Sequence, residues 1–210
     1  MTGLDDDARP TPIRGLVFDL GGVVIDLDFG RVFARWGELA DADPVELRDR
    51  WSMDEVYERH ERGEITEAEY FDWLSSALDI ELTLDQWVDG WNAIYVGPVM
   101  GVDSLLAEVA ERYPLYGFTN SNATHTACWK IEFEELLSPF ATIFVSSTIG
   151  LRKPEARAFN FIADTVGLPI EALHFFDDSE ENVVGARAAG LSASHVTTLA
   201  ELRAATRALA

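Results

Sequence analysis

Apolar residues follow two different spacings along this chain, and the change between them divides it into parts. Residues 16–18 form an unbroken apolar run, which is typical of a strand buried on both faces of a parallel sheet. From about residue 27 the spacing becomes helical and stays so to about residue 97. The first helix of this part is predicted from apolar residues at intervals of three and four: Phe29, Val32, Phe33 and Trp36.

Two further helices of this part are marked by their first residues. Thr66 with Glu69, and Thr83 with Gln86, have the spacing of a capping box. The second box predicts a helix that carries on one face Leu84, Trp87, Val88, Trp91, Ile94 and Tyr95. Residues 97–98 (Gly-Pro) then end the helical pattern, so we predict an all-helical insertion over residues 27–97.

After the insertion, short apolar runs alternate with segments of helical spacing. Strands are predicted at residues 115–119, 143–145 and 173–176, and a last short strand follows these. Helices are predicted at residues 102–112 and 124–137 and from Pro154 to Gly167. Another helix follows the strand at 173–176 and ends at Ala189, and a last one lies at the C-terminus. This alternation predicts an α/β fold with a doubly wound parallel sheet. The expected organisation is a flexible acidic tail (1–11), an α/β core (12–26 and 98–210) and the helical insertion (27–97).

Charge and cysteine content exclude several classes of partner. The 210 residues carry a formal net charge of −21, which argues against nucleic acid and against an anionic membrane surface. No apolar run approaches 18 residues, and the first residues lack the basic and apolar regions of a signal peptide. A single cysteine, Cys128, excludes an internal disulfide and fits a reducing compartment, so we expect a cytoplasmic protein.

Polar side chains stand where the predicted core strands end: Asp19, Thr119 with Asn120, Ser146 with Ser147, and Asp177 with Asp178. The carboxyl ends of parallel strands lie along one edge of a sheet, where ligands bind in open α/β folds. Carboxylates gathered there suit a hard cation such as Mg²⁺. An aspartate in such a place can also attack phosphorus and form an aspartyl-phosphate.

Other residues near these strand ends suit a phosphate group. The Thr119 hydroxyl and the amides that follow it, leading into a helix, can bind phosphate oxygens. Of the 16 basic residues only Lys130 and Lys153 are lysines, and Lys153 follows a predicted strand. A compact ammonium group there would offset negative charge on a transferring group.

Each of these residues, taken alone, also has a simpler interpretation. Asp19 and residues 119–122 can cap a turn or a helix, and Lys153 can be a surface residue. Asp177 and Asp178 can be favourable charges at a helix N-terminus. Their common position, at a strand end or in the loop after one, favours the functional interpretation.

With these residues the chain resembles the haloacid dehalogenase superfamily of hydrolases, over about residues 13–197. Four segments resemble the four motifs of that family: residues 18–23 (Phe-Asp-Leu-Gly-Gly-Val), 118–120 (Phe-Thr-Asn), 150–155 (Gly-Leu-Arg-Lys-Pro-Glu), and 176–179 (Phe-Asp-Asp-Ser) with Asn182 and residues 185–186. The resemblance implies Asp19 as nucleophile, Thr119 and Asn120 as phosphate ligands, Lys153 as charge stabiliser, and Asp178 as Mg²⁺ ligand with Asp177 beside it. It also implies that the insertion is a cap that closes over the site and selects the substrate.

A closer similarity links the chain to the bacterial α-D-glucose-1-phosphate phosphatase subgroup. It rests on residues 26–29, 60–65, 90–91 and 152–157. Most phosphatases of the superfamily have a second aspartate two residues after the nucleophile, as general acid and base, but this chain has Gly21. The subgroup resembles this sequence in having glycine there, and Gly21 keeps the backbone carbonyl that normally binds the metal from this position.

Candidate substrate contacts in the cap are His60, Glu61 and Arg62, which we expect at the mouth of the site, and Trp91, which with Trp87 can stack on a sugar ring. The alternatives are a solvated loop for residues 60–62 and the packing of a small helical core for the tryptophans.

The function that follows is a Mg²⁺-dependent phosphatase of a small phosphorylated metabolite, with a sugar 1-phosphate as the candidate substrate. One alternative is a 2-haloacid dehalogenase in which Asp19 attacks carbon. Its fourth motif needs no metal, so the acidic pair at residues 177–178 counts against it. The other alternative is a phosphate-binding module without catalysis.

Overall fold

The computed structural model of the protein describes residues 11–209, so all but the last residue of the predicted acidic tail lies outside the described residues. Its centre is a five-stranded sheet in the order β5-β4-β1-β6-β7, with every neighbouring pair parallel. The strands are β1 (Gly15–Phe18), β4 (Leu115–Thr119), β5 (Phe140–Val145), β6 (Leu173–Asp177) and β7 (Ser192–His195). The predicted α/β fold with a parallel sheet is confirmed.

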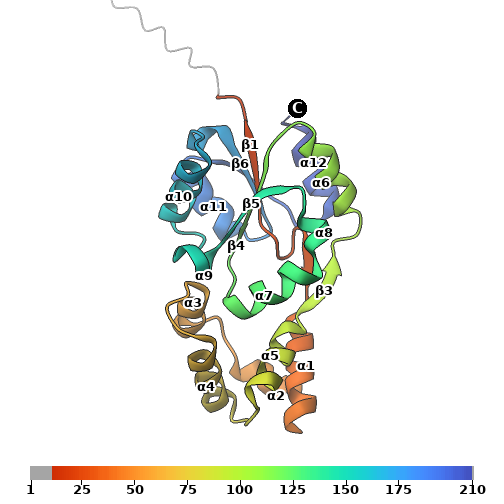
Figure 1. Ribbon diagram of the computed structural model, residues 1–210, viewed down its shortest axis with the longest axis vertical. Coiled ribbons are helices and arrows are strands. Elements are labelled where there is room, and N and C mark those ends of the chain that lie inside the picture. Colours follow the sequence, from red (N-terminus) through yellow and green to blue (C-terminus); the bar gives the residue numbers. More distant parts are fainter. Residues whose placement is uncertain (1–10, 210) are drawn as a thin grey trace, which may run out of the picture.

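Helices cover both faces of the sheet (Figure 1). One face packs against α6 (Val102–Ala110) and α12 (Leu199–Arg207), and the other against α10 (Ala156–Val166) and α11 (Glu180–Ala189). Side chains of β1 alternate between these layers: Leu16 and Phe18 belong to the first, Val17 to the second, and all three are fully buried. This double burial explains the unbroken apolar run.

The helical insertion forms a cap below the core in Figure 1. Its helices are α1 (Phe29–Ala40), α2 (Pro44–Arg50), α3 (Glu55–Glu61), α4 (Glu67–Leu78) and α5 (Leu84–Asn92). Both predicted capping boxes are present, at Thr66 with Glu69 and at Thr83 with Gln86. The insertion is therefore built of helices, as the spacing of its apolar residues predicts.

A two-stranded antiparallel ribbon joins the cap to the core, and here the prediction was wrong. The ribbon consists of β2 (Ile25–Leu27) and β3 (Tyr95–Pro98). Tyr95 pairs with Leu27 across it, so Tyr95 and the preceding Ile94 lie outside α5, which ends at Asn92. Their spacing fits a helix, but pairing with the distant strand β2 gives these backbone groups their partners.

Tryptophans fill the centre of the cap. Trp36 and Trp91 are fully buried and stack with ring centroids 5.6 Å apart, and the Trp87 ring lies 4.9 Å from that of Trp36. A Cβ atom at Gly90 would lie 2.1 Å from Cδ1 of Trp36, so only glycine permits this packing. The alternative interpretation of the tryptophans, as the core of a small helical block, is the one the structure supports.

Several helix boundaries in the core differ from the predictions. The helix predicted at 124–137 is divided at Phe133 into α7 (Ala123–Glu132) and α8 (Glu134–Leu137). Pro154 precedes α10 by two residues, and two short elements follow or precede strands: α9 (Ser146–Ile149) and the 3-10 turn η1 (Ile170–Ala172). The predicted ends at Gly167 and Ala189 are confirmed, and left-handed backbone at Gly167 and Gly190 terminates the two helices. Among residues 11–209, no helix has the length and apolarity that crossing a membrane requires.

Candidate active site

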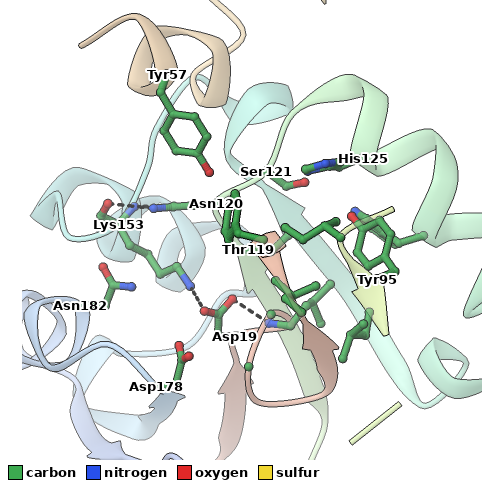
Figure 2. Close-up of a pocket in the computed structure, with 18 residues that line it drawn as sticks. Asp19, Tyr57, Tyr95, Thr119, Asn120, Ser121, His125, Lys153, Asp178 and Asn182 are labelled. Atoms are coloured by element: carbon green, nitrogen blue, oxygen red, sulfur yellow. Dashed lines mark hydrogen bonds and ion pairs between the residues drawn. The ribbon is translucent and has the colours of Figure 1, made fainter. Parts of the chain in front are cut away.

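A cavity of about 350 Å³ lies at the carboxyl ends of the strands, between the core and the cap. Figure 2 shows four of the predicted site residues facing it: Asp19, Thr119, Lys153 and Asp178. They come from four separate segments of the chain, which the parallel sheet brings to one edge. The structure thus brings the core residues of the predicted site together.

Asp19 stands directly after β1 and is held at both carboxylate oxygens. Its Oδ1 accepts a hydrogen bond from the Leu20 amide at 2.7 Å, and its Oδ2 lies 2.8 Å from Nζ of Lys153. Burial raises the pKa of the Asp19 carboxyl, and Asp177 and Asp178 add to the rise, whereas Lys153 opposes it. A cation bound beside Asp19 would favour its charged form, which is the form that can attack.

Lys153 is almost fully buried, with 1% of its surface exposed. Its Nζ lies 2.8 Å from Asp19 and 2.7 Å from Asp177, and 5.4 and 5.5 Å from the ring centroids of Phe118 and Phe175. Burial alone would lower the pKa of this ammonium, but the two carboxylates together raise it, so Lys153 stays charged. The interpretation of Lys153 as an ordinary surface residue is excluded.

Asn120 fixes the backbone of Lys153. Its side-chain Nδ2 donates to the Lys153 carbonyl at 3.0 Å, and its Oδ1 accepts from the Lys153 amide at 2.9 Å. Both ends of the Asn120 amide therefore have a partner. The structure gives this side chain a positioning role, while the second hydrogen of Nδ2 and the backbone of Asn120 remain available for the predicted phosphate contact.

The two carboxylates after β6 have different surroundings. Asp177 is fully buried; its Oδ2 accepts from Lys153, and its Oδ1 accepts from the Ser179 amide and from Asn182. Asp178 is more exposed and lines the cavity. Gly22, at φ +73°, makes room for it, because a Cβ atom there would lie 2.1 Å from Oδ2 of Asp178.

These carboxylates fit a divalent cation of the Mg²⁺ type. Asp19, Asp177 and Asp178 each offer an oxygen atom, and the three atoms lie within 4.8 Å of one another. Mg²⁺ prefers such oxygen ligands and takes few of them from protein. Asp19 and Asp178 are the better placed pair, because both line the cavity, whereas Asp177 is fully buried behind it against Lys153.

Thr119 and the start of α7 form another wall of the cavity. Thr119 ends β4 and lines the cavity, while Asn122 caps α7 by accepting the His125 amide at 2.9 Å. The capping interpretation therefore holds for Asn122, and Thr119 remains available to a ligand. His125 is neutral, because burial lowers its pKa to about 3, and its ring nitrogens contact Asn122 and the Trp91 carbonyl.

Gly21 leaves no side chain where a general acid would stand. An ideal Cβ atom at this position would lie 2.6 Å from Cδ1 of Leu27, a residue of β2 that lines the cavity. An apolar side chain therefore occupies the space beside Gly21.

The four cap residues expected at the substrate do not line the cavity. Glu61 and Arg62 pair with core residues instead: Glu61 lies 2.9 Å from Arg152, and Arg62 lies 2.9 Å from Glu155. His60 is buried and stacks on Tyr70 at 4.2 Å. Trp91 is fully buried in the cap. Glu61 and Arg62 thus join the cap to the core, and His60 packs inside the cap, so residues 60–62 do not form the solvated loop of the alternative interpretation.

Sequence reasoning missed the cap side chains that do line the cavity, such as Phe29 and Tyr57. Phe29 was assigned to a helix face, and Tyr57 was not singled out. Both lie on amphipathic helices whose apolar faces also build the cap. Which of their side chains reaches the cavity depends on how the cap rests on the core, and no spacing in the sequence reports that.

Comparisons with known proteins agree with this geometry. A family model described as haloacid dehalogenase-like hydrolase matches residues 13–190. D-ribitol-5-phosphate phosphatase of Bacteroides thetaiotaomicron is 25% identical over 177 residues, which cover 81% of this chain and 85% of that protein. A sesquiterpene phosphatase of Aspergillus oryzae is 26% identical over 211 residues, covering 92% and 96%.

A solved structure of the same family has a similar fold. A haloacid dehalogenase family enzyme of Bacteroides thetaiotaomicron, in complex with magnesium and inorganic phosphate, superposes with a TM-score of 0.75 and 26% identity. The match covers 87% of this chain and 93% of that one.

Proposed function

The chain belongs to the haloacid dehalogenase-like hydrolase family, and on that premise we propose that it is a Mg²⁺-dependent phosphatase that uses Asp19 as its nucleophile. Its substrate is a small phosphorylated metabolite. The observation that carries the proposal is the contact of buried Lys153 with Asp19, 2.8 Å apart, at a cavity that Thr119 and Asp178 also line.

Asp19 and Asp178 would hold the metal, together with the backbone carbonyl of Gly21. A relative of known structure contains magnesium and inorganic phosphate, which supports the choice of metal. Bound there, Mg²⁺ would supply positive charge that favours the ionised form of Asp19 and neutralises the phosphate. Asp177 would position Lys153, which its Oδ2 contacts at 2.7 Å.

The residues of the chain account for both steps of phosphoester hydrolysis. A carboxylate oxygen of Asp19 forms a bond to phosphorus while the bond to the leaving oxygen breaks, which gives an aspartyl-phosphate on Asp19. Thr119 and the amides after it bind the phosphate oxygens, and Lys153 offsets the charge that develops on them. Water then attacks phosphorus, releases inorganic phosphate and restores the Asp19 carboxylate.

The absence of a side chain at residue 21 bears on the substrate. Without an acid there, the leaving oxygen must depart as an anion or take its proton from water. An anomeric oxygen leaves more easily than a primary alkoxide, because the adjacent ring oxygen stabilises its charge. A sugar 1-phosphate is therefore our candidate substrate, in keeping with the similarity of the sequence to glucose-1-phosphate phosphatases.

The test is hydrolysis of a panel of phosphomonoesters with Mg²⁺ or with chelator. We expect phosphate release that requires Mg²⁺, and loss of that release in Asp19→Asn. Release of halide from a 2-haloacid in chelator would support the dehalogenase alternative. Phosphate binding without turnover of any ester would support the non-catalytic alternative.

A further inference from the structure

The cap offers the cavity few groups that can form hydrogen bonds. Within the described chain, the cap residues that line the cavity are Leu27, Phe29, Tyr57, Ile94 and Tyr95. Three of these are hydrocarbon side chains, so any hydrogen bond from a cap side chain to the substrate must come from a tyrosine hydroxyl.

The hydroxyl of Tyr95 belongs to the side of the cavity formed by α7. Burial raises the pKa of Tyr95, and so do Cys128 and Glu132, two neighbours on the outer part of that helix. Its ring rests edge-on against His125 and Phe133, at 5.6 and 5.7 Å. Tyr95 therefore acts mainly as a wall of the cavity.

Tyr57 has a different orientation. It extends from α3 with its hydroxyl directed into the cavity, on the side opposite Asp19 (Figure 2). Its ring is 7% exposed and packs against Trp51 at 5.6 Å and Tyr70 at 6.3 Å. Aromatic neighbours thus fix the ring, and with it the place of the hydroxyl oxygen.

This side of the cavity matters because of the direction of the reaction. A nucleophile that attacks phosphorus displaces the leaving oxygen in line, on the far side of the phosphorus atom. With Asp19 on the sheet edge, the leaving group extends towards the cap, where Tyr57 lies. Two other polar groups nearby already have partners, namely the amide of Asn120 and the ring nitrogens of His125.

Burial and the nearby charge of Glu61 keep Tyr57 protonated. Glu61 follows Tyr57 by one turn of α3, and its Oε2 accepts two hydrogen bonds from Arg152, at 3.1 and 2.9 Å. Burial raises the pKa of Tyr57 well above its ordinary value, and the negative charge of Glu61 raises it further. Tyr57 therefore keeps its proton, and its hydroxyl can both donate and accept a hydrogen bond.

We propose that Tyr57 is a specificity-determining residue that forms a hydrogen bond with a hydroxyl group on the leaving group of the substrate. The substrates are then phosphate esters of sugars or polyols rather than of hydrocarbons. Leu27, Phe29 and Ile94 pack against the C–H faces of such a molecule. This inference rests on the proposed phosphatase function and selects, among the substrates of the relatives, the ribitol phosphate class over the sesquiterpene phosphate class.

The experiment compares Tyr57→Phe with the parent on three substrates: glucose 1-phosphate, ribitol 5-phosphate and phenyl phosphate. Tyr57→Phe removes only the hydroxyl. We expect kcat/KM to fall about tenfold for whichever hydroxylated ester the parent turns over best, the effect of one lost hydrogen bond. For phenyl phosphate, which has no hydroxyl, we expect a change of less than about twofold.

Tyr70→Phe is the matched control, because it makes the same substitution in the same cap. Tyr70 does not line the cavity, and its hydroxyl accepts only a long 3.4 Å hydrogen bond from Trp51. We expect kcat/KM of this variant to stay near that of the parent for all three substrates. An equal loss in both variants would show a general disturbance of the cap and overturn the inference.

Monodeoxy glucose 1-phosphates then identify the hydroxyl, provided the parent uses this sugar. The deoxy analogue that lacks the hydroxyl bound by Tyr57 should be turned over equally by parent and Tyr57→Phe, whereas the others keep the difference. An equal loss for phenyl phosphate, or a parent that prefers phenyl phosphate to both hydroxylated esters, would overturn the inference while leaving the phosphatase function intact. No hydrolysis of any ester with Mg²⁺ would overturn the proposed function itself, and the inference with it.

Discussion

Nζ of Lys153 lies 2.8 Å from Oδ2 of Asp19, so a buried ammonium is in direct contact with the carboxylate proposed to attack phosphorus. The side chain has no room for a broader group, because the rings of Phe118 and Phe175 flank it. Geometry as well as charge therefore distinguishes this lysine from the arginines that form most of the basic residues of the chain.

Lys153→Arg should lower kcat at least about 10²-fold, because a planar guanidinium cannot occupy the space of a compact ammonium between two carboxylates. Steady-state kinetics on the best substrate measures this effect. Arg152→Lys is a control for a change of charge type in the adjacent residue, and it should lower kcat far less. Near-normal kcat in Lys153→Arg would mean that only the positive charge matters.

Asp19→Asn should lower kcat at least about 10⁴-fold, because it removes the nucleophile while changing only one atom of the side chain. The fold should survive, since the one oxygen of Asn can still accept the hydrogen bond from the Leu20 amide, and only the contact with Lys153 is lost. Circular dichroism and thermal unfolding of the variant check this point. Turnover within a few-fold of the parent would remove Asp19 from its proposed role.

Mg²⁺ should raise the melting temperature of the parent, because a ligand that binds only the folded state stabilises it. In Asp178→Asn this increase should be much smaller, and activity should be lost. We expect this of Asp178 because its carboxylate lines the cavity and can reach the metal. Asp177, by contrast, is fully buried against Lys153. Full activity in excess chelator would contradict the metal site and favour the dehalogenase alternative.

His60 should make the protein sensitive to mild acid. Burial lowers its pKa from 6.5 to about 4, and neither ring nitrogen has a hydrogen-bond partner among the described residues. The unfolded chain therefore binds a proton below pH 6.5 that the folded protein binds only near pH 4, so folded-state stability falls as pH drops through this window. From pH 7 to pH 5 this single group should cost about 2 kcal/mol.

The variant His60→Leu isolates this effect. The free energy of unfolding, measured with urea, should fall between pH 7 and pH 5 in both proteins. In the variant this fall should be smaller by about 2 kcal/mol. Other groups, including the buried carboxylates whose pKa is raised, contribute equally to both proteins and cancel in the comparison. Equal losses would mean that the folded protein lets His60 take up a proton as readily as the unfolded chain does, and would contradict the burial of an unpaired ring.

The core of the fold could be predicted from sequence because its signals are local. The run at residues 16–18 must be a strand buried on both faces, and the polar residues after the strands meet because parallel strands share one edge. Capping boxes at Thr66 and Thr83 set helix starts by contacts within four residues. The same locality explains why the core site residues were found.

The cap contacts could not be predicted, because they depend on pairing between distant segments. Ile94 and Tyr95 continue a helical spacing, yet β3 pairs with β2 from across the insertion. Glu61 and Arg62 look like exposed charges until the core supplies Arg152 and Glu155 as partners. Tyr57 has no motif at all, and its importance appears only when the cap rests on the cavity.

Gly21 allows a test of the leaving-group preference. A positioned general acid is typically worth about 10²–10⁴ in rate, because it protonates the leaving oxygen as its bond to phosphorus breaks. The parent, which has no side chain there, should turn over sugar 1-phosphates and aryl phosphates well and sugar 6-phosphates poorly. Gly21→Asp should narrow this gap, because it should raise kcat/KM more for the slow substrates than for the fast ones.

The structure adds a steric condition to that test. A Cβ atom at residue 21 would lie 2.6 Å from Cδ1 of Leu27, which is the flexible end of a side chain, so Leu27 must move. Gly21→Ala carries the same steric change without an acid and is therefore the matched control. The measurement is kcat/KM for glucose 1-phosphate and glucose 6-phosphate in the parent and both variants.

Gly21→Ala should lower kcat/KM for glucose 1-phosphate and for glucose 6-phosphate by a similar factor, because a methyl group can only displace Leu27. The ratio of the two kcat/KM values should therefore stay unchanged. Gly21→Asp should shift the ratio towards glucose 6-phosphate, since only this variant can protonate a poor leaving group. Where the ratio stays the same in both variants, or is already near one in the parent, another group supplies the proton. Within the described cavity His125 is a poor candidate for that group, because burial keeps it neutral and both of its ring nitrogens already have partners.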